Sequence, residues 1–526
     1  MSSSDLLARV ENAPYDTRTL TKPKIVSDKG VVVSQNVEAA TVGADILRSG
    51  GNAIDAAVGT ALALTVAEPW MSGLGGGGFM VIHSARDKTT KVIDFGMVAP
   101  KGLKVSDYKL AGGQGGDLFG WPSVEGDINI HGPKAIAVPG SPAGYALALE
   151  TYGTKSWAEV SQPAIAMADR GHRITWWSTL QVASDAPILA RYPDSAKVYL
   201  ANGYPPVMSP DPTPAYMDMG NLATTLRTLA DKGPREFYEG EIARSLASSV
   251  QALGGTLSTD DLAAYQARLL DPLTVKRGGV DLHVPQGLSA GPTFADAMSR
   301  LPDTFSGKPD AETYGAYAAA LIAAYEKRLE TMGHAGDVGD RSCTTHLSAV
   351  DAEGNMVAIT TTLLSRFGSR VVLGDTGVLM NNGINWFDPR PGLPNSLTPG
   401  ERPLSNMCPL IATRDGEAWF AFGASGGRKI MPAVLQLANF VTDFGMDIEQ
   451  AFAQPRIDVS PISRVIADAR LDDAAIAAIE RTAPAQRWAE MESPATYATP
   501  VAVAREAGQC QGAAHIYSPL VGAAGA

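Results

Sequence analysis

The most constraining feature of this chain is a threonine that stands between a predicted loop and a predicted β-hairpin. Residues 343–348 read Cys-Thr-Thr-His-Leu-Ser, and the first threonine is Thr344. A threonine hydroxyl is a poor nucleophile at neutral pH, but the residue's own α-amino group can activate it once the chain is cut just before it. A free α-amine titrates at roughly 7.7 to 8.0, so part of it can accept a proton near neutral pH. Thr344 therefore indicates self-processing chemistry.

The residues before Thr344 predict a helix that ends in a loop. Residues 311–332 are rich in alanine, which has the highest helix propensity, and predict a long helix. Residues 333–340 (Gly-His-Ala-Gly-Asp-Val-Gly-Asp) contain the glycines and aspartates that stop helices and form turns. We therefore expect the nucleophile to follow a loop rather than to continue a helix.

The residues after Thr344 predict a β-hairpin. Two β-rich runs are separated by the turn-forming residues 351–355. If Val350 pairs with Met356, the same register sets Thr344 directly opposite Thr362. Opposed Cβ atoms lie about 4.5 to 5.5 Å apart, so the Thr362 hydroxyl could hydrogen-bond the nucleophile. A threonine-rich hairpin without any chemical role would give the same pattern, so the interpretation needs support from elsewhere in the chain.

That support comes from five motifs that follow one another along the sequence. They are Gly-Asn-Ala-Ile-Asp-Ala-Ala-Val at 51–58, Glu-Pro-Trp-Met-Ser-Gly-Leu-Gly-Gly-Gly-Gly-Phe-Met at 68–80, Thr-Thr-His-Leu-Ser-Ala-Val-Asp at 344–351, Arg-Pro-Leu-Ser at 402–405 and Gly-Gly at 426–427. Together they resemble the γ-glutamyltranspeptidase family of N-terminal-nucleophile hydrolases, from about residue 25 to residue 457.

The resemblance implies a fold and a set of roles. The fold is α+β, a four-layer αββα sandwich, and the precursor is cut between Cys343 and Thr344. Residues 1–343 and 344–526 then form a heterodimer of two chains within one interlocked structural domain, and further dimerisation stays open. Thr344 is implied to be the nucleophile and to carry the base, with Thr362 supporting it. The backbone N–H groups of Gly426 and Gly427 are implied to form the oxyanion hole.

The role implied for the glycine pair also agrees with its local sequence. Residues 417–422 read as a strand and residues 430–443 as an apolar helix. Gly426 and Gly427 then lie near a helix start, where backbone amides lack partners inside the helix. Such donors can stabilise an oxyanion, and loss of one typically costs about 2.7 to 4 kcal/mol of transition-state stabilisation. Taken alone, the segment would read as an ordinary tight turn.

The chain departs from the family where the family binds a γ-glutamyl group. The family contacts the α-carboxylate with the arginine of an Asp-Phe-Arg motif, and the α-amino group with an asparagine, a glutamine and an aspartate. The corresponding positions here are Gly96, Leu364, Gly383 and Trp386. A Ser-Ser pair that follows Arg-Pro-Leu in many relatives is also changed, to Ser405-Asn406, and we expect these two residues in the substrate site. Hydrogen bonds to charged groups are worth about 1.5 to 3 kcal/mol each, so a γ-glutamyl ligand should bind poorly.

These departures favour an N-terminal-threonine amidohydrolase or acyltransferase whose acyl group is not γ-glutamyl. Oxamate amidohydrolases and cephalosporin acylases are relatives with such departures, so oxamate or another small dicarboxylic monoamide is the candidate small-molecule substrate. A γ-glutamyl hydrolase or transferase and a glutaryl acylase are the alternatives. Four basic residues near the catalytic elements could bind a substrate carboxylate or be solvated surface charges: Arg366, Arg370, Arg428 and Lys429.

Other interpretations have less support. Ser425 lies in a Gly-Ala-Ser-Gly-Gly motif between a predicted strand and helix, and Asp458 and His515 follow in the order of an α/β-hydrolase triad. That alternative leaves most of the preceding chain without a role. Cys343 as nucleophile would end the first chain after cleavage, away from the hairpin. A catalytically dead binding protein would have little reason to retain Thr344 and the glycine pair.

Composition excludes several partners. The net charge of −12 argues against nucleic acid and against an anionic membrane surface, since both attract basic patches. The apolar run 53–67 has 15 residues, short of the about 20 that span a membrane, and predicts a buried helix. Residues 1–12 lack the basic start and apolar run of a secretory signal, so we expect a cytoplasmic protein.

Cysteine and histidine patterns predict neither a disulfide framework nor a metal site. The chain has three cysteines and seven histidines, and the histidines show no paired spacing. The Gly-x-Gly-x-x-Gly run at 73–78 follows a predicted helix and precedes a strand, the reverse of the dinucleotide-binding order. We expect no cofactor. His346, two residues past Thr344 on the same predicted strand face, is the histidine best placed to support the site.

Overall fold

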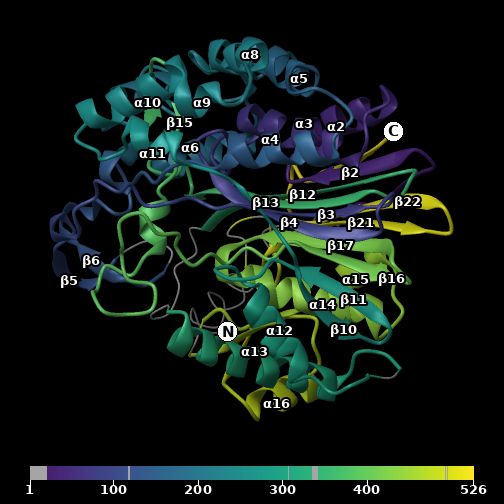
Figure 1. Ribbon diagram of the computed structural model, residues 1–526. Helices are drawn as coiled ribbons and strands as arrows, with labels where there is room; N and C mark the ends of the chain where they lie inside the picture. The colour runs from purple at the N-terminus through teal and green to yellow at the C-terminus, as the bar shows by residue number, and fades with distance from the viewer. Residues whose placement is uncertain are drawn as a thin grey trace.

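Two seven-stranded β-sheets stacked face to face form the centre of the computed structural model (Figure 1). The structure describes residues 20–115, 119–305, 307–333, 342–461, 463–491, 493 and 496–526. The first sheet has the order β23 (Gly522–Gly525), β2 (Gly30–Ser34), β12 (Ser342–Asp351), β13 (Met356–Ser365), β3 (Gly77–Ser84), β4 (Thr89–Phe95) and β9 (Arg268–Leu270). The second has the order β1 (Ile25–Ser27), β22 (Gln509–Ala514), β21 (Thr499–Glu506), β17 (Glu417–Ser425), β16 (Leu410–Arg414), β11 (Val280–Val284) and β10 (Leu273–Arg277).

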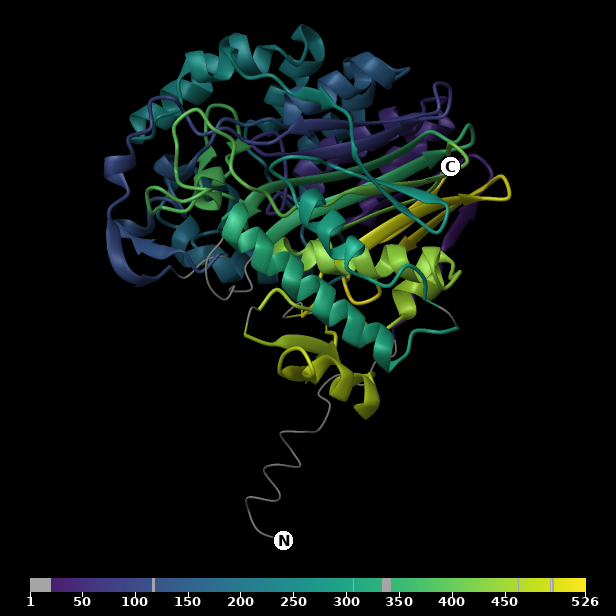
Figure 2. The same cartoon turned by 60° about the horizontal axis from the view of Figure 1, so that its bottom comes forward.

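Helices cover both outer faces of this pair of sheets (Figure 1). On the first sheet lie α2 (Val37–Arg48), α3 (Ala53–Ala67), α4 (Ser141–Tyr152), α5 (Trp157–Arg170) and, further out, α8 (Leu222–Lys232) and α10 (Glu241–Ala252). On the second lie α12 (Gly291–Ser299), α13 (Ala311–Thr331), α14 (Ile430–Thr442) and α16 (Asp473–Glu480), and Figure 2 shows the long α13 crossing in front of α14. The predicted four-layer αββα sandwich is therefore confirmed.

Strand alternation explains why four layers form. Successive side chains of a strand point to opposite faces, and almost every position of β12 and β13 is apolar or small and buried. Leu347 and Ile359 pack with α3 in one apolar cluster. Val350 and Ala358 face the other way and join a second cluster between the sheets. A third cluster buries α12, α13 and α14 on the second sheet.

Helix α3 is confirmed as a buried helix. All 15 of its residues are buried, so it packs on every side rather than along one stripe. Asn52 caps its start by accepting hydrogen bonds from the N–H groups of Ile54 and Asp55, and the Asp55 carboxylate accepts one from Asn52 in return. None of the helices in the described ranges combines the length and apolar character needed to cross a membrane.

Both sheets contain strands from before and from after Thr344, and strands of the two segments pair with each other. In the first sheet, β2 lies between β23 and β12, so Val32 pairs with Ala524 on one side and with Ala349 on the other. In the second sheet, β1 pairs with β22 and β11 pairs with β16. The segments 1–343 and 344–526 therefore share hydrogen-bonded ladders and bury their apolar side chains together, as expected of two chains in one structural domain.

The hairpin that carries Thr344 has the predicted register over most of its length. Val350 pairs with Met356, and Thr345 pairs with Thr361. The expectation that Thr344 directly opposes Thr362 is wrong, because the register shifts between Cys343 and Thr345. Thr344 alone then faces two residues of β13, a β-bulge that bends the strand at its end. Residues 334–340 of the expected loop lie outside the described ranges.

The side chain of His346 lies between the two sheets, two residues after Thr344 on β12. Its Nδ1 lies 2.8 Å from Thr360 Oγ1 and its Nε2 lies 3.1 Å from Ser348 Oγ. Burial lowers the pKa of His346 to about 3, so the ring is neutral at physiological pH. A Cβ atom on Gly423 of β17 would lie 2.0 Å from the ring carbon Cε1. Only glycine at this position lets β17 approach the imidazole.

Replacing Gly423 should therefore destabilise the fold. We expect Gly423→Ala to lower the free energy of unfolding by about 1 to 3 kcal/mol, because the buried ring is hydrogen-bonded on both sides and cannot move aside freely. Chemical denaturation measures this change. Gly102→Ala is the matched control, since its Cβ would meet only the Thr256 carbonyl oxygen, at 3.6 Å. Equal stability of the two variants would contradict the account of this contact.

Candidate active site

Thr344 and Thr362 lie side by side at the end of the hairpin. Their hydroxyl oxygens are 3.5 Å apart, at the outer limit of a hydrogen bond, and both side chains are buried. The backbone N–H of Leu364 donates to Thr362 Oγ1 over 2.8 Å. The bulge thus keeps the expected proximity of the two hydroxyls even though it removes their direct pairing.

The backbone at Leu364 adopts a left-handed conformation. Its φ angle is 86°, and Phe367 and Arg370 further along have φ angles of 57° and 61°. Non-glycine residues in this region cost energy and often occur where a functional group must be held in place. The left-handed conformation at Leu364 lets its backbone N–H donate to Thr362 Oγ1. The strained backbone therefore helps to fix the position of the Thr362 hydroxyl.

Two asparagines bring the predicted acyl-binding residues together. Asn382 Oδ1 accepts from the N–H of Ser365 at 2.9 Å, and Asn381 Oδ1 accepts from the N–H of Gly383 at 2.8 Å. These bonds hold the short helix η4 (Gly383–Trp386) against the end of β13. Leu364 and Trp386 are both buried and belong to the same apolar cluster.

The side chain of another arginine, Arg402, lies beside Gly96. A Cβ on Gly96 would lie 3.4 Å from Nη1 of Arg402 and 3.1 Å from Oδ1 of Asp94. Arg402 also donates to the Gly96 carbonyl and to Asp94 Oδ1 and stacks on the Tyr265 ring. A guanidinium therefore lies beside Gly96, but Asp94 and two carbonyls hold it.

Ser405 and Asn406 follow Arg402 on a segment tied to η4. Asn395 makes the connection, because its Nδ2 donates to the Trp386 carbonyl at 2.6 Å and its Oδ1 accepts from the N–H of Leu404 at 3.0 Å. Both Ser405 and Asn406 are buried. The structure thus gathers residues that are far apart in the sequence around one end of the first sheet.

Gly426 and Gly427 form the turn between β17 and α14, as the sequence predicts. Their φ angles are 137° and 56°, which side chains rarely adopt. A Cβ on Gly426 would also lie 3.0 Å from Cα of Ala498. The short helix η5 (Gly427–Lys429) that follows lies against β12. Two amides near a helix start next to the strand that carries Thr344 are donors of the kind that can hold a developing oxyanion.

Glu68 is a member of this region that the sequence analysis did not single out. Its Oε2 accepts a hydrogen bond from Thr345 Oγ1 at 2.8 Å, on the helix-facing side of the sheet next to Thr344. Burial at the end of α3 raises the pKa of Glu68 to about 8, and the negative end of the helix also disfavours its ionised form. Its position as the first residue of the 68–80 motif was the feature of the sequence that could have identified it.

Four basic residues differ in what they can do. Arg370 and Arg366 lie 3.1 and 3.4 Å from the carboxylate of Asp185, so both already share this one acid as an ion-pair partner. Arg428 is buried, and its carbonyl accepts a hydrogen bond from the Tyr325 hydroxyl. Lys429 lies next to it in η5.

The residues of the serine-hydrolase alternative are engaged differently from a triad. His515 Nε2 lies 2.7 Å from Glu490 Oε1, and Glu490 also binds Arg456. Asp458 accepts from the hydroxyl and N–H of Ser460. The carboxylate that orients His515 is therefore Glu490 rather than the Asp458 that this alternative requires.

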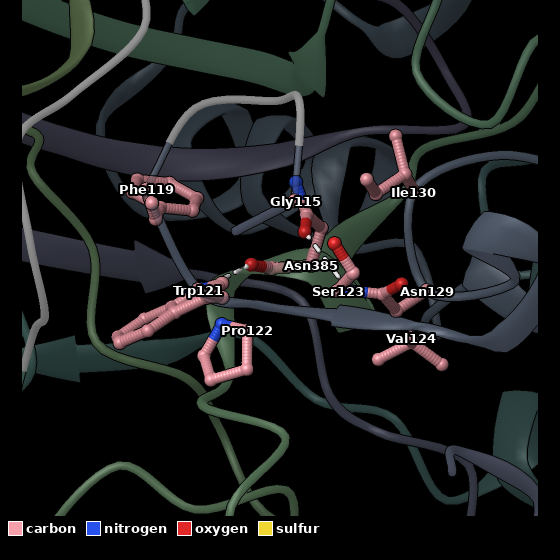
Figure 3. Close-up of a pocket in the computed structure, with 10 residues that line it drawn as sticks. Gly115, Phe119, Trp121, Pro122, Ser123, Val124, Asn129, Ile130 and Asn385 are labelled. Carbon is pink, nitrogen blue, oxygen red and sulfur yellow. Dashed lines mark hydrogen bonds between the residues drawn. The ribbon is translucent and has the colours of Figure 1, made fainter. Parts of the chain in front are cut away.

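A small cavity lies where the hairpin of β5 (Leu110–Gln114) and β6 (Pro122–Val124) meets η4 (Figure 3). Its volume is about 10 Å³, room for one water molecule. Trp121, which directly precedes β6, donates its Nε1–H to the Asn385 carbonyl beside this cavity. This hydrogen bond ties the hairpin to η4. Among the described residues, no group of three or more His, Cys, Asp and Glu side chains could hold a metal ion.

Comparisons with known proteins agree with this geometry. The model of the gamma-glutamyltranspeptidase family matches residues 39–338 and 312–519. The glutathione hydrolase proenzyme of Escherichia coli (strain K12) is 33% identical over 485 residues, which cover 81% of this chain and 80% of that protein. The acylase ACY 1 proenzyme of Pseudomonas sp. (strain V22) is 33% identical over 479 residues, 84% of each chain. A cephalosporin acylase from Bacillus halodurans shares the fold, with a TM-score of 0.84 at 22% identity over 98% of this chain and 99% of that one.

The environment of Glu68 predicts a pH dependence of stability. Its carboxyl stays protonated in the folded protein up to pH about 8, whereas it ionises near 4.5 in the unfolded chain. Between these values the folded state binds the extra proton, so stability falls as the pH rises. We expect Glu68→Gln to abolish this fall, which is on the order of a few kcal/mol. Thermal unfolding from pH 5 to 8 measures it, with the exposed Glu480→Gln as control. Parallel curves for the wild type and Glu68→Gln would refute the assignment.

Proposed function

The chain belongs to the gamma-glutamyltranspeptidase family, and we propose from this that it is a self-processing amidohydrolase with Thr344 as its nucleophile. Relatives named glutathione hydrolase proenzyme and acylase proenzyme support an enzyme that cleaves amide bonds after self-cleavage. The observation that carries the proposal is the placement of the Thr344 hydroxyl 3.5 Å from that of Thr362, on the strand that η5 packs against.

Self-processing would begin at the peptide bond between Cys343 and Thr344. Thr344 Oγ1 attacks the Cys343 carbonyl carbon, the C–N bond breaks, and the acyl group moves from nitrogen to oxygen as an ester. Water then hydrolyses the ester, which leaves a carboxylate on the first chain and a free α-amine on Thr344. The pairing of strands from both segments in each sheet would keep the chains of 343 and 183 residues together.

The free amine then supplies the base for substrate turnover. It accepts the hydroxyl proton as Oγ1 attacks the substrate carbonyl, and it returns that proton to the leaving amine. Thr362 orients Oγ1, and the N–H groups of Gly426 and Gly427 hold the oxyanion of the tetrahedral intermediate. Water attacks the acyl-enzyme ester by the same route, so the acid is released and the threonine is regenerated.

The acyl group is proposed to lack the α-amino group of a γ-glutamyl group. Leu364 and Trp386 form an apolar wall at the positions of polar family contacts, and burial of an ammonium against them would leave it unpaired. Oxamate or another small dicarboxylic monoamide is the favoured substrate. A glutaryl acylase is the first alternative, and the likeness to acylase ACY 1 supports an acylase in general. The likeness to glutathione hydrolase supports the second alternative, γ-glutamyl hydrolysis or transfer.

Replacement of Thr344 tests the nucleophile. We expect Thr344→Ala to give one uncut, inactive chain on a denaturing gel, because both the attacking hydroxyl and the later α-amine base are lost. Wild-type protein should give two bands in a ratio of about two to one by length, with Thr344 as the N-terminus of the smaller. Ser425→Ala is the control and should process and remain active. The reverse pattern, an inactive Ser425→Ala and an active Thr344→Ala, would favour the α/β-hydrolase alternative.

A γ-glutamyl anilide tests the substrate class. We expect its hydrolysis to be slower than that of the preferred substrate by roughly three orders of magnitude or more, because several hydrogen bonds to its charged head group are missing. Steady-state kinetics with oxamate, other dicarboxylic monoamides and glutaryl amides in parallel measure the difference. Saturable turnover of the γ-glutamyl anilide at the rate of the best of these compounds would refute the substrate argument.

A further inference from the structure

The turn that carries Gly426 and Gly427 leads into α14, and the third residue of this helix is Pro432. In an α-helix each N–H donates to the carbonyl four residues earlier, so residue 432 would donate to the carbonyl of Arg428. Proline has no N–H, and this helix bond therefore does not form. The Arg428 carbonyl, which follows Gly427 directly, depends on a donor from elsewhere in the fold.

Tyr325 of α13 supplies such a donor, because its hydroxyl donates to the Arg428 carbonyl in the interior of the protein. Burial raises the pKa of the Tyr325 phenol, and the nearby guanidinium of Arg328 lowers it by less, so the hydroxyl keeps its proton. Figure 2 shows α13 crossing in front of α14, which places this side chain at the start of the second helix. One hydroxyl thus replaces the N–H that Pro432 lacks.

A series of bonds connects this hydroxyl to the N–H of Gly427. The Arg428 carbonyl and the Lys429 N–H belong to one planar peptide unit, and that N–H donates to the Gly426 carbonyl at 3.1 Å. The Gly426 carbonyl and the Gly427 N–H belong to a second planar unit. In a trans peptide the carbonyl and the N–H point in opposite directions. Fixing the Arg428 carbonyl therefore fixes the direction of the Gly427 N–H.

The turn needs such bonds because glycine restricts its own backbone very little. Gly426 and Gly427 have φ angles of 137° and 56°, and steric limits alone would allow the peptide between them to rotate. Hydrogen bonds arranged head to tail also polarise one another, so each strengthens the next. The Tyr325 hydroxyl stands at the beginning of this series, and the Gly427 N–H stands at its end.

We propose that Tyr325 is a positioning residue for the oxyanion hole, whose hydroxyl aims the Gly427 N–H at the negative charge of the tetrahedral intermediate. Tyr325 acts through the turn rather than on the substrate. It belongs to the segment 1–343, whereas the turn belongs to the segment 344–526, so the first chain of the processed enzyme orients a donor of the second. This inference rests on the proposed amidohydrolase function and adds a residue to its machinery.

Tyr325→Phe tests the role of the hydroxyl, since it removes one oxygen atom and keeps the ring. The substrates are oxamate and the monoanilides of succinic and glutaric acid, and steady-state kinetics of the processed enzyme give kcat and KM. We expect kcat to fall by roughly 10- to 100-fold, part of the effect of losing an oxyanion donor outright. KM should stay within about twofold, because the bond matters chiefly in the transition state.

Tyr314→Phe is the matched control on the same helix. The Tyr314 hydroxyl is also buried and also donates to a backbone carbonyl, that of Pro455, at 2.9 Å. Both variants lose one hydrogen bond of the same kind, so their melting temperatures should fall by similar amounts. Only Tyr325→Phe should lower kcat, which separates positioning from stability.

Pro432→Ala provides a rescue that a merely structural tyrosine would not show. Alanine restores the N–H at residue 432, which can then donate to the Arg428 carbonyl in regular helix geometry. Alone, this change should leave kcat within about twofold of the wild type, since the carbonyl already has a donor. Combined with Tyr325→Phe, it should recover most of the lost kcat.

Three results would overturn the role of Tyr325 while amide hydrolysis by Thr344 still stood. They are an unchanged kcat in Tyr325→Phe, a lowered kcat that Pro432→Ala does not restore, and a Tyr325→Phe variant that fails to fold although Tyr314→Phe folds. A wild type that neither processes itself nor cleaves any of these amides would overturn the proposed function and this inference with it. A fall in kcat confined to Tyr325→Phe and reversed by Pro432→Ala would support the inference.

Discussion

The hydrogen-bonded ladders of β12 with β13 and β2 are the constraint on which this structure depends. A strand that is paired on both sides is a rigid support, and β12 pairs with β13 and with β2. A bulge in β13 opposite Thr344 releases Thr344 from regular pairing, and the left-handed turn at Leu364 brings the Thr362 hydroxyl to it. Thr344 is thus held at the end of a rigid strand but is itself free of regular strand pairing.

Three of the buried ionisable groups in this region, His346, Glu68 and Arg328, differ in their charge at neutral pH. His346 is neutral between the sheets, where Thr360 and Ser348 satisfy its ring. Glu68 is protonated up to about pH 8 on the helix side, where it binds Thr345. Arg328 alone keeps its charge, since an arginine resists deprotonation even when burial lowers its pKa to about 10.

The comparisons and the geometry answer different questions. Family membership follows from a match over most of the chain and from relatives 33% identical, and it fixes the kind of chemistry. The proposed substrate class rests instead on a few positions where this chain departs from the family, above all Gly96, Leu364 and Trp386. At Gly96 the space of a side chain is bordered by Arg402, which Asp94 holds, so the lost contact is not simply replaced by a nearby arginine.

The sequence by itself determined the local elements: the hairpin register through Val350 and Met356, the buried helix α3 and the glycine turn after β17. These follow from side-chain periodicity and turn chemistry, which act between near neighbours. Only the tertiary structure decided the bulge at Thr344, the pairing of Arg366 and Arg370 with Asp185, the protonated Glu68 and the hydrogen bond from Tyr325 to the Arg428 carbonyl. Burial and charge pairing join residues that are far apart in the chain, and no local pattern records which of them will meet.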